Sequence, residues 1–225
     1  DKSSILRRAI EGKAKSISSS PIQSRFLGLP DATLSYWLQD EFLNLFNDHG
    51  RLGKQVEVRH GLSTCENDRF VRTAWECNNR AGWADLAKGG TYRKWAGLEQ
   101  WKVDWRYTGA AIKESIRAKF PYLKGNVGLV IGSEEFYFRS GWTYSTVSSG
   151  SFGVRELSAA AIASHTSYGI FSVTPDVDAV VLNSRLATYL LRSLTPKLIF
   201  EGGQVASLPL LDNTGRLPSL LVSCD

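Results

Sequence analysis

Two polar, glycine-containing segments constrain this chain more than any other feature of its sequence. They run from Arg59 to Arg72 and from Ala87 to Trp95. Glycine and clustered polar residues favour turns, so a folded chain must hold both segments on irregular backbone at the surface of a rigid support. We therefore expect the rest of the chain to build a packed scaffold from which these two turns project.

The two turns combine basic, amide and aromatic side chains. The polar members are Asn67, Arg69, Arg72, Lys88, Arg93 and Lys94, and the aromatic neighbours are Phe70, Tyr92 and Trp95. Lysine and arginine neutralise phosphates, whereas arginine and amide side chains can also pair with base edges. The mixture therefore predicts a surface that reads nucleic acid. A pair of solvated loops, anchored to a core by their aromatic residues, explains the composition equally well.

Positive charge is concentrated in one part of the chain. The net charge of the whole sequence is only +5, but the segment from Arg80 to Lys124 contains ten basic and four acidic residues. Its net charge is therefore +6, and the net charge of the rest of the chain is −1. A local surplus of this kind is typical of a face that follows a phosphate backbone. The alternative is an exposed amphipathic helix with ordinary solvated lysines.

Composition indicates a globular chain that is part of something longer. The 225 residues are 43% hydrophobic, enough for a substantial core, and no apolar run is long enough to span a bilayer. Because the sequence starts at Asp1 and contains no methionine, we expect an upstream region. Cys65, Cys77 and Cys224 are odd in number and lack ligand spacing, which favours reduced thiols in a prokaryotic cytoplasm.

Hydrophobic periodicity predicts a mixture of helices and strands, and so an α+β fold. The expected helices cover residues 3–17, 31–47 with Asp31 as the cap, 110–119, and 176 or 178 to 194. The expected strands cover residues 55–59, 101–105, 136–138, 141–143, 159–163 and 169–173.

Several short motifs resemble one family in the same order along the chain. They are Leu34–Leu38, GLSTCENDRF at 61–70, KGGTYRKW at 88–95, Trp142–Arg155 and Leu182–Pro209. Together they resemble the target-recognition region of BREX-type adenine-specific DNA methyltransferases, the PglX family, which is similar to the specificity domains of combined restriction-modification enzymes. The family pattern is Gly-Asp-Asn-Asp-Arg-Phe, so Cys65 and Glu66 depart from it while Asn67 and Arg69 are kept.

The resemblance implies a fold, a domain plan and a set of DNA contacts. The fold is a mixed, mainly antiparallel, curved sheet with flanking helices, in which residues 205–209 would form the closing strand. Residues 1–30 would connect to an upstream methyltransferase domain, 31–211 would recognise DNA, and 212–225 would form a tail. The Ser-Ser-Gly-x-Phe-x-x-Arg element that ends at Arg155 would also lie near DNA, although a tight turn between two strands explains it as well. The implied DNA-binding residues are Ser63, Thr64, Asn67, Arg69, Arg72, Lys88, Arg93, Lys94, Ser148, Ser149 and Arg155.

The chain lacks the sequence features of a catalytic centre. Related methyltransferases place two prolines and an aromatic residue in the flipped-base pocket, and this chain contains no Pro-Pro pair. His165 has no partner at metal spacing. We therefore expect no cofactor in this chain and S-adenosylmethionine in a longer parent enzyme.

The resemblance also implies partners and a role. They are double-stranded DNA, the upstream methyltransferase domain and, in addition, other proteins of an anti-phage defence system, with no membrane. The predicted function is to steer adenine methylation to one DNA sequence. The alternative is a protein interaction module of the defence complex, whose basic face binds an acidic partner.

Overall fold

The computed structural model describes residues 2–13, 21–77, 81–172, 179–195 and 197–211. The chain divides into two compact units, Asp1–Asp48 and His49–Asp225, which we call the N-terminal and C-terminal units. Among the described residues, no helix has the length and apolar character needed to cross a membrane.

The N-terminal unit is helical. It contains α1 (Lys2–Ile10), the 3-10 helices η2 (Gln23–Gly28) and η3 (Pro30–Ala32), and α2 (Asp40–Asp48). An ion pair of 2.7 Å between Arg25 and Asp40 connects η2 to α2. The helix expected over 31–47 begins only at Asp40, because Asp31 has a φ of 54° and does not cap a helix. The part of the 3–17 prediction beyond Lys13 lies outside the described residues.

The C-terminal unit contains two four-stranded sheets, which confirms the predicted α+β class. The sheet with order β1-β8-β5-β6 is antiparallel throughout. Its strands are β1 (Val56–Arg59), β5 (Gly141–Ser145), β6 (Val154–Leu157) and β8 (Ser167–Ser172). The sheet with order β2-β4-β3-β7 ends in a parallel pair of β3 with β7. Its strands are β2 (Val71–Thr73), β3 (Trp83–Ala87), β4 (Trp101–Asp104) and β7 (Ala161–Ala163).

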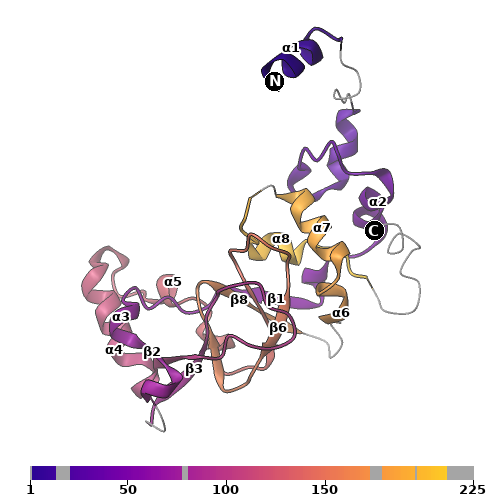
Figure 1. Ribbon diagram of the computed structural model, residues 1–225. Helices are drawn as coiled ribbons and strands as arrows, with labels where there is room; N and C mark the ends of the chain where they lie inside the picture. The colour runs from indigo at the N-terminus through magenta and orange to yellow at the C-terminus, as the bar shows by residue number, and fades with distance from the viewer. Residues whose placement is uncertain (1, 14–20, 78–80, 173–178, 196, 212–225) are drawn as a thin grey trace. The chain divides into compact units, whose positions relative to one another are not determined.

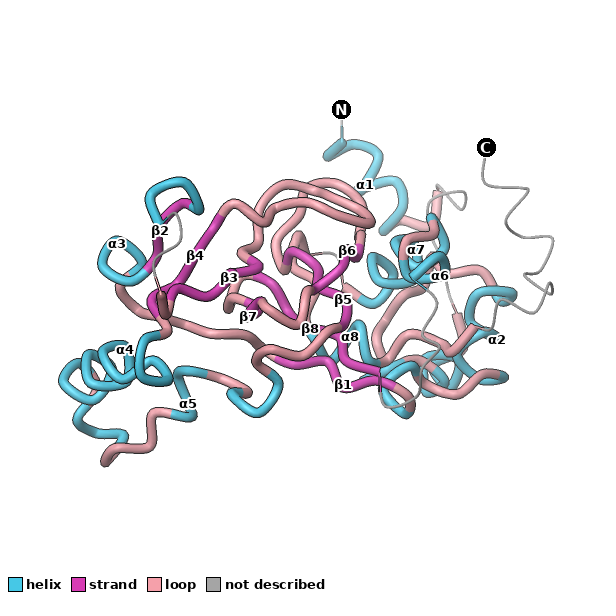
Figure 2. Tube along the Cα trace, turned by 90° about the horizontal axis from the view of Figure 1, so that it is seen from below, coloured by secondary structure: helices cyan, strands magenta, loops and turns pink. Residues whose placement is uncertain are grey.

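The sheet that contains β4 is covered by helices from the middle of the chain. These are α3 (Asn67–Phe70), α4 (Arg106–Lys119) and α5 (Gly128–Ile131), which lie beside it in Figures 1 and 2. One hydrophobic core joins them: Ile112 and Ile116 of α4 and Ile131 of α5 are fully buried with Val103 of β4. The regular part of α4 agrees with the helix predicted over 110–119, since Tyr107 to Gly109 form a left-handed turn.

Helices from the end of the chain accompany the other sheet. They are α6 (Ala179–Leu182), α7 (Arg185–Leu194) and α8 (Gly202–Ala206), and α8 packs against β1. The long helix predicted up to 194 is therefore interrupted, because the hydroxyl of Ser184 caps a new helix by accepting a 3.1 Å hydrogen bond from the Ala187 N–H. Residues 173–178 lie outside the described part of the chain.

Two predicted strands are wrong. In the segment 205–209, Val205 and Ala206 end α8, because Glu201 and Gln204 form a reciprocal capping box that starts a helix at Gly202. Pro209 forms only an isolated β-bridge with Arg51. The segment 136–138 is the end of the 3-10 helix η7 (Glu134–Phe136), followed by Phe138 with a φ of 60°. The strands predicted at 55–59, 101–105 and 141–143 correspond to β1, β4 and β5.

Candidate nucleic-acid interface

A short segment between β7 and β8, residues 163–167, holds both glycine-containing turns against the scaffold. On one side, the Leu62 N–H donates to the carbonyl of Ala163 at 2.7 Å. On the other side, the Ser164 N–H donates to the carbonyl of Ala87 at 3.0 Å, and the Gly89 N–H donates to the Thr166 hydroxyl at 3.0 Å. The two turns therefore dock on a common segment, although 26 residues separate Leu62 from Lys88 in the sequence.

Close approach explains why glycine occurs in both turns. A Cβ atom on Gly61 would lie 2.1 Å from the carbonyl oxygen of Ala163, and one on Gly89 would lie 1.9 Å from that of Thr166. Both distances are far shorter than a normal contact, so a larger residue would push each turn off the segment. Gly61 and Gly89 therefore allow the two turns to pack closely against this segment. The resulting backbone path determines the positions of the neighbouring polar side chains.

The two turns meet in an open pocket of about 310 Å³, which we call the Trp101 pocket. It is lined by Asn67, Asp68, Val71, Arg72, Glu76, Lys88 and Trp101. The Lys88 ammonium lies 4.5 Å from the centre of the Trp101 ring, within the range of a cation–π contact. Three of the predicted DNA-binding residues, Asn67, Arg72 and Lys88, thus come together from separate segments.

The first turn is a short helix, α3, and its geometry fixes Asn67. The Thr64 hydroxyl donates to the Asn67 side-chain oxygen at 2.7 Å, which orients the amide and leaves its NH₂ group as the donor. The Arg72 guanidinium donates to the carbonyls of Asp68 and Val71 at 2.6 and 2.8 Å. The pocket therefore presents fixed donors together with the carboxylates of Asp68 and Glu76, a set that can pair with both donors and acceptors on a ligand.

Arg69 lies in the same helix but outside the set that lines the Trp101 pocket. Its side chain is 63% exposed, and its guanidinium is 3.4 Å from the Glu66 carboxylate and 4.9 Å from the centre of the Phe70 ring. A hydrogen bond from Ser115 holds the pKa of Glu66 below its usual value, and Arg69 and Lys119 act in the same direction. Arg69 is thus an exposed cation beside an ionised carboxylate.

The second turn lies against the Ser/Gly segment. A Cβ on Gly153 would come within 3.0 Å of the Arg93 carbonyl oxygen and of the Tyr92 ring. The Lys94 ammonium donates to the carbonyl of Asn183 and lies 5.8 Å from the centre of the Tyr92 ring. Arg93 is exposed, and no ion pair to it is found among the described residues. The cluster therefore offers Arg93 to a ligand, whereas Lys94 is engaged by the protein.

Four predicted DNA-binding residues are enclosed by the protein to different degrees. Thr64, Ser148 and Arg155 are buried, with exposed fractions of 2, 8 and 1%, and Ser63 is half-buried. The Ser148 hydroxyl accepts from the Gly150 N–H at 3.2 Å, as expected for a tight turn. Ser149 is exposed, and its carbonyl accepts from Arg192. In this structure the side chains of Thr64, Ser148 and Arg155 are therefore not offered at the surface.

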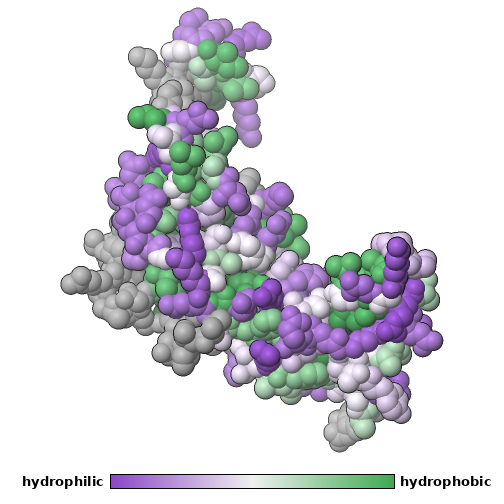
Figure 3. All heavy atoms as spheres, turned by 180° about the vertical axis from the view of Figure 1, so that it is seen from behind, coloured by the Kyte–Doolittle hydropathy of each residue, from purple (hydrophilic) through white to green (hydrophobic). Residues whose placement is uncertain are grey.

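The predicted basic surplus is partly neutralised inside the protein. Lys102 pairs with Asp85, Arg106 with Asp104 and Lys113 with Glu134, each at 2.6 Å. Arg80 lies outside the described residues. Arg93, Arg117 and Lys124 remain exposed without a described ion pair. Figure 3 shows one face of the molecule, on which hydrophilic side chains are interspersed with apolar patches. The surplus is therefore smaller at the surface than in the sequence.

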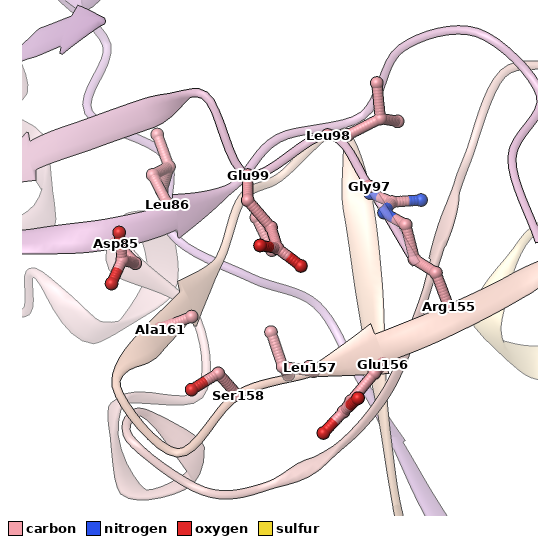
Figure 4. A pocket seen from close by; sticks show the side chains of 11 residues that line it. Asp85, Leu86, Gly97, Leu98, Glu99, Arg155, Glu156, Leu157, Ser158 and Ala161 are labelled. Atoms are coloured by element: carbon pink, nitrogen blue, oxygen red, sulfur yellow. The ribbon is translucent and has the colours of Figure 1, made fainter. Parts of the chain in front are cut away.

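A second pocket, the Glu99 pocket, has a volume of about 290 Å³ (Figure 4). It is lined by Asp85, Leu86, Ala87, Gly97, Leu98, Glu99, Arg155, Glu156, Leu157, Ser158 and Ala161. Three of its lining residues are carboxylates, and the buried Arg155 side chain reaches toward the loop at Gly97 in Figure 4. In the described part of the chain, no group of three or more His, Cys, Asp or Glu side chains could hold a metal ion.

Sequence reasoning missed part of the Trp101 pocket. It did not select Asp68, Glu76 or Trp101 as site residues. Trp101 packs against the hydrophobic core that contains Val103, and its half-buried ring is covered by Lys88. The signal that could have found it is the adjacency of Trp101 to Arg72 and Thr73 across the β2–β4 ladder, which requires knowledge of the strand pairing.

Fold and site together define an α+β unit with an open pocket of amide, guanidinium, ammonium and indole groups. No protein-family model matches the chain. Homologues of the chain are adenine-specific methyltransferases. Adenine-specific methyltransferase PglX of Lacticaseibacillus casei (strain Zhang) is 28% identical over 208 residues, which cover 84% of this chain and 17% of the relative. Adenine-specific methyltransferase BrxX of Escherichia coli O9:H4 (strain HS) is 24% identical over 207 residues, which cover 85% of this chain. The chain spans only 16–17% of the length of these relatives.

Proposed function

We propose that this chain is the target-recognition part of an adenine-specific DNA methyltransferase of an anti-phage defence system. In this proposal a catalytic domain elsewhere in the parent enzyme uses S-adenosylmethionine to methylate adenine. The C-terminal unit selects the DNA sequence at which this happens. The similarity to PglX and BrxX supports the parent activity.

The observation that carries the proposal is the convergence of Asn67, Arg72 and Lys88 on the open Trp101 pocket. Asparagine pairs with adenine, and arginine or lysine pairs with guanine, in the major groove of DNA. Carboxylates such as Asp68 and Glu76 can accept from the cytosine amino group. The pocket thus holds side chains of each type that reads base edges, on backbone fixed by the segment 163–167.

Exposed cations around this pocket supply phosphate contacts in the proposal. Arg93 on the second turn, Arg69 on α3 and Arg117 on α4 are exposed. Contacts of this kind set the position and strength of binding without selecting sequence. Arg106 and Lys102 contribute less, because each is paired with an aspartate of the protein.

Methylome sequencing of cells that carry the full-length gene tests the proposal. We compare the unaltered protein with Asn67→Ala, Arg72→Ala and Lys88→Ala, and we use Lys54→Ala as the control. Lys54 is an exposed cation of η4 (Leu52–Lys54), which contacts α8 and β1. A lost or relaxed methylation sequence in the first three variants, and an unchanged one in the control, supports the proposal. Unchanged methylation in all variants contradicts it.

A protein interaction module is the second candidate, and the Glu99 pocket favours it. Glu99 and Glu156 would repel phosphate at that site but would attract a basic segment of another protein, whereas Asp85 is already paired with Lys102. In this case the substitutions in the Trp101 pocket leave the methylated sequence unchanged. Substitutions in the Glu99 pocket instead release a protein partner, which co-purification with the full-length protein detects.

A further inference from the structure

A buried arginine connects the scaffold to the turn that carries Lys88. Arg155 lies in β6 and is 1% exposed, and no carboxylate lies within ion-pair distance of it among the described residues. Burial lowers the pKa of Arg155 to about 10, while the charge of Glu99 opposes this shift, so the guanidinium stays protonated at neutral pH. An unpaired buried charge is costly to the fold. A side chain such as methionine would fill the same place without that cost.

The hydrogen bonds of this guanidinium converge on the second turn. It donates to the carbonyl of Lys88 at 3.2 Å and to the hydroxyl of Ser145 at 3.4 Å. The same hydroxyl accepts from the Gly90 N–H at 3.1 Å. Arg155 and Ser145 therefore bind the backbone on both sides of Gly89. Hydrogen bonds from a charged donor are stronger than those between neutral groups.

The strand that contains Arg155 also fixes the far end of this turn. The Trp95 N–H donates to the carbonyl of Val154 at 2.9 Å, and the Glu156 N–H donates to the carbonyl of Trp95 at 2.9 Å. Trp95 has a φ of 70°, a strained conformation for a residue with a side chain. Residues 154–156 thus hold the turn at both ends, at Lys88 through a side chain and at Trp95 through the backbone.

We infer that Arg155 is a positioning residue for the Trp101 pocket, acting through the backbone carbonyl of Lys88. The inference rests on the proposed function, since it assumes that Lys88 touches DNA. By fixing this carbonyl, Arg155 keeps the Lys88 ammonium over Trp101, where it faces the same pocket as Asn67 and Arg72. This role explains why an arginine occupies position 155, although its side chain is buried and does not reach the surface.

The test compares Arg155→Met, Arg155→Lys and Ser145→Ala in the full-length protein. The first readout is hydrogen exchange of a peptide covering residues 88–95, with a peptide covering β8 as the internal control. Arg155→Met and Ser145→Ala should speed exchange at Gly90 and leave β8 protected. Arg155→Lys should be intermediate, because an ammonium can reach fewer acceptors at once.

The second readout is methylation of the cognate sequence in cells. Arg155→Met should lower it by up to about a hundredfold, since a shift of roughly 1 Å in a positioned group can have that effect. Arg155→Lys should restore part of the loss. Unchanged exchange in residues 88–95 overturns the inference, and so does faster exchange with unchanged methylation. If Arg155→Met fails to fold, Ser145→Ala tests the inference by the same hydrogen-exchange and methylation measurements.

Lys88→Ala separates this inference from the proposed function. If it abolishes sequence selection and leaves the exchange of residues 88–95 unchanged, the pocket reads DNA and only the role of Arg155 is in question. If Lys88→Ala, Asn67→Ala and Arg72→Ala all leave methylation unchanged while Arg155→Met alters exchange, the proposed function fails, although Arg155 still orders the turn.

Discussion

The two pockets of the C-terminal unit use β3 and the residue that directly follows it, respectively, and they differ in the groups they present. The Trp101 pocket includes Lys88, which directly follows β3, and it also has Asn67 and Arg72. The Glu99 pocket is lined partly by residues of β3 itself, and three of its lining residues are carboxylates. In the Glu99 pocket the guanidinium is buried, whereas in the Trp101 pocket the cations are half-buried at an open surface.

A strand and the residue that directly follows it can therefore line two chemically different pockets. Donors that are fixed but still reach solvent can recognise a polyanion, because pairing with it does not require the protein to unfold locally. A buried guanidinium can only organise its surroundings. The comparison predicts that substitutions in the Trp101 pocket change DNA binding strongly and that substitutions in the Glu99 pocket change it weakly.

The largest expected effect comes from Arg72→Ala together with Lys88→Ala. Each contact to a base edge contributes roughly 1–3 kcal/mol of discrimination, so the double variant should bind the cognate duplex at least about thirtyfold more weakly relative to a mismatched one. Competition binding with both duplexes measures this ratio. Equal loss for both duplexes would show that these cations touch only phosphates, and Lys54→Ala should leave the ratio unchanged.

Arg93→Ala should have a smaller effect that does not depend on sequence. Arg93 is exposed on the second turn, outside the set of residues that lines the Trp101 pocket. Removing one phosphate contact lowers the slope of log affinity against log salt by about one and weakens cognate and mismatched duplexes alike. Fluorescence anisotropy at several salt concentrations gives the slope. A selective loss of cognate binding would instead place Arg93 against a base.

Glu99→Gln should tighten DNA binding slightly. Glu99 is exposed at the edge of the Glu99 pocket, and removing its charge relieves repulsion of phosphate. Exposed charge interactions contribute about 0.2–1 kcal/mol, which corresponds to at most about a fivefold gain in affinity. The same anisotropy titration measures the gain. A loss of cognate discrimination in Glu99→Gln would reverse the assignment of the two pockets.

The smallest expected effect concerns the pair of Asp104 and Arg106. Hydrogen bonds from Arg106 lower the pKa of Asp104, outweighing the opposing effect of burial. The ionised carboxylate therefore stabilises the fold above the usual aspartate pKa, and this contribution is lost as pH falls through the lowered pKa of the folded state. Asp104→Asn should lower the unfolding temperature at neutral pH, and the gap to the unaltered chain should shrink on acidification. A gap that grows in acid contradicts this assignment.

Local patterns in the sequence were enough to predict several elements. Alternation predicted β1 and β4, and helical spacing together with Pro121 predicted the regular part of α4. Such patterns arise because one face of the element is buried, and they can be seen within the sequence of the single segment. The strand that the resemblance implied at 205–209 is wrong, because the capping box of Glu201 and Gln204 starts a helix that continues through Ala206.

The candidate site was only partly predictable, because its geometry depends on contacts between distant segments. The sequence indicated Asn67, Arg72 and Lys88 as polar residues of turns, but their meeting at Trp101 requires the β2–β4 pairing and the docking of both turns on residues 163–167. Arg155 shows the limit most clearly. The family resemblance implied DNA contact for Arg155, but its side chain is buried and donates to the carbonyl of Lys88 and the hydroxyl of Ser145.

Photo-crosslinking from single positions tests the central claim most directly. We replace either Lys88 or Glu99 in the full-length protein with p-benzoylphenylalanine and irradiate the complex with a duplex that carries the methylated sequence. The account predicts crosslinks to bases from position 88 and none from position 99. Crosslinks from position 99, with none from position 88, would contradict it.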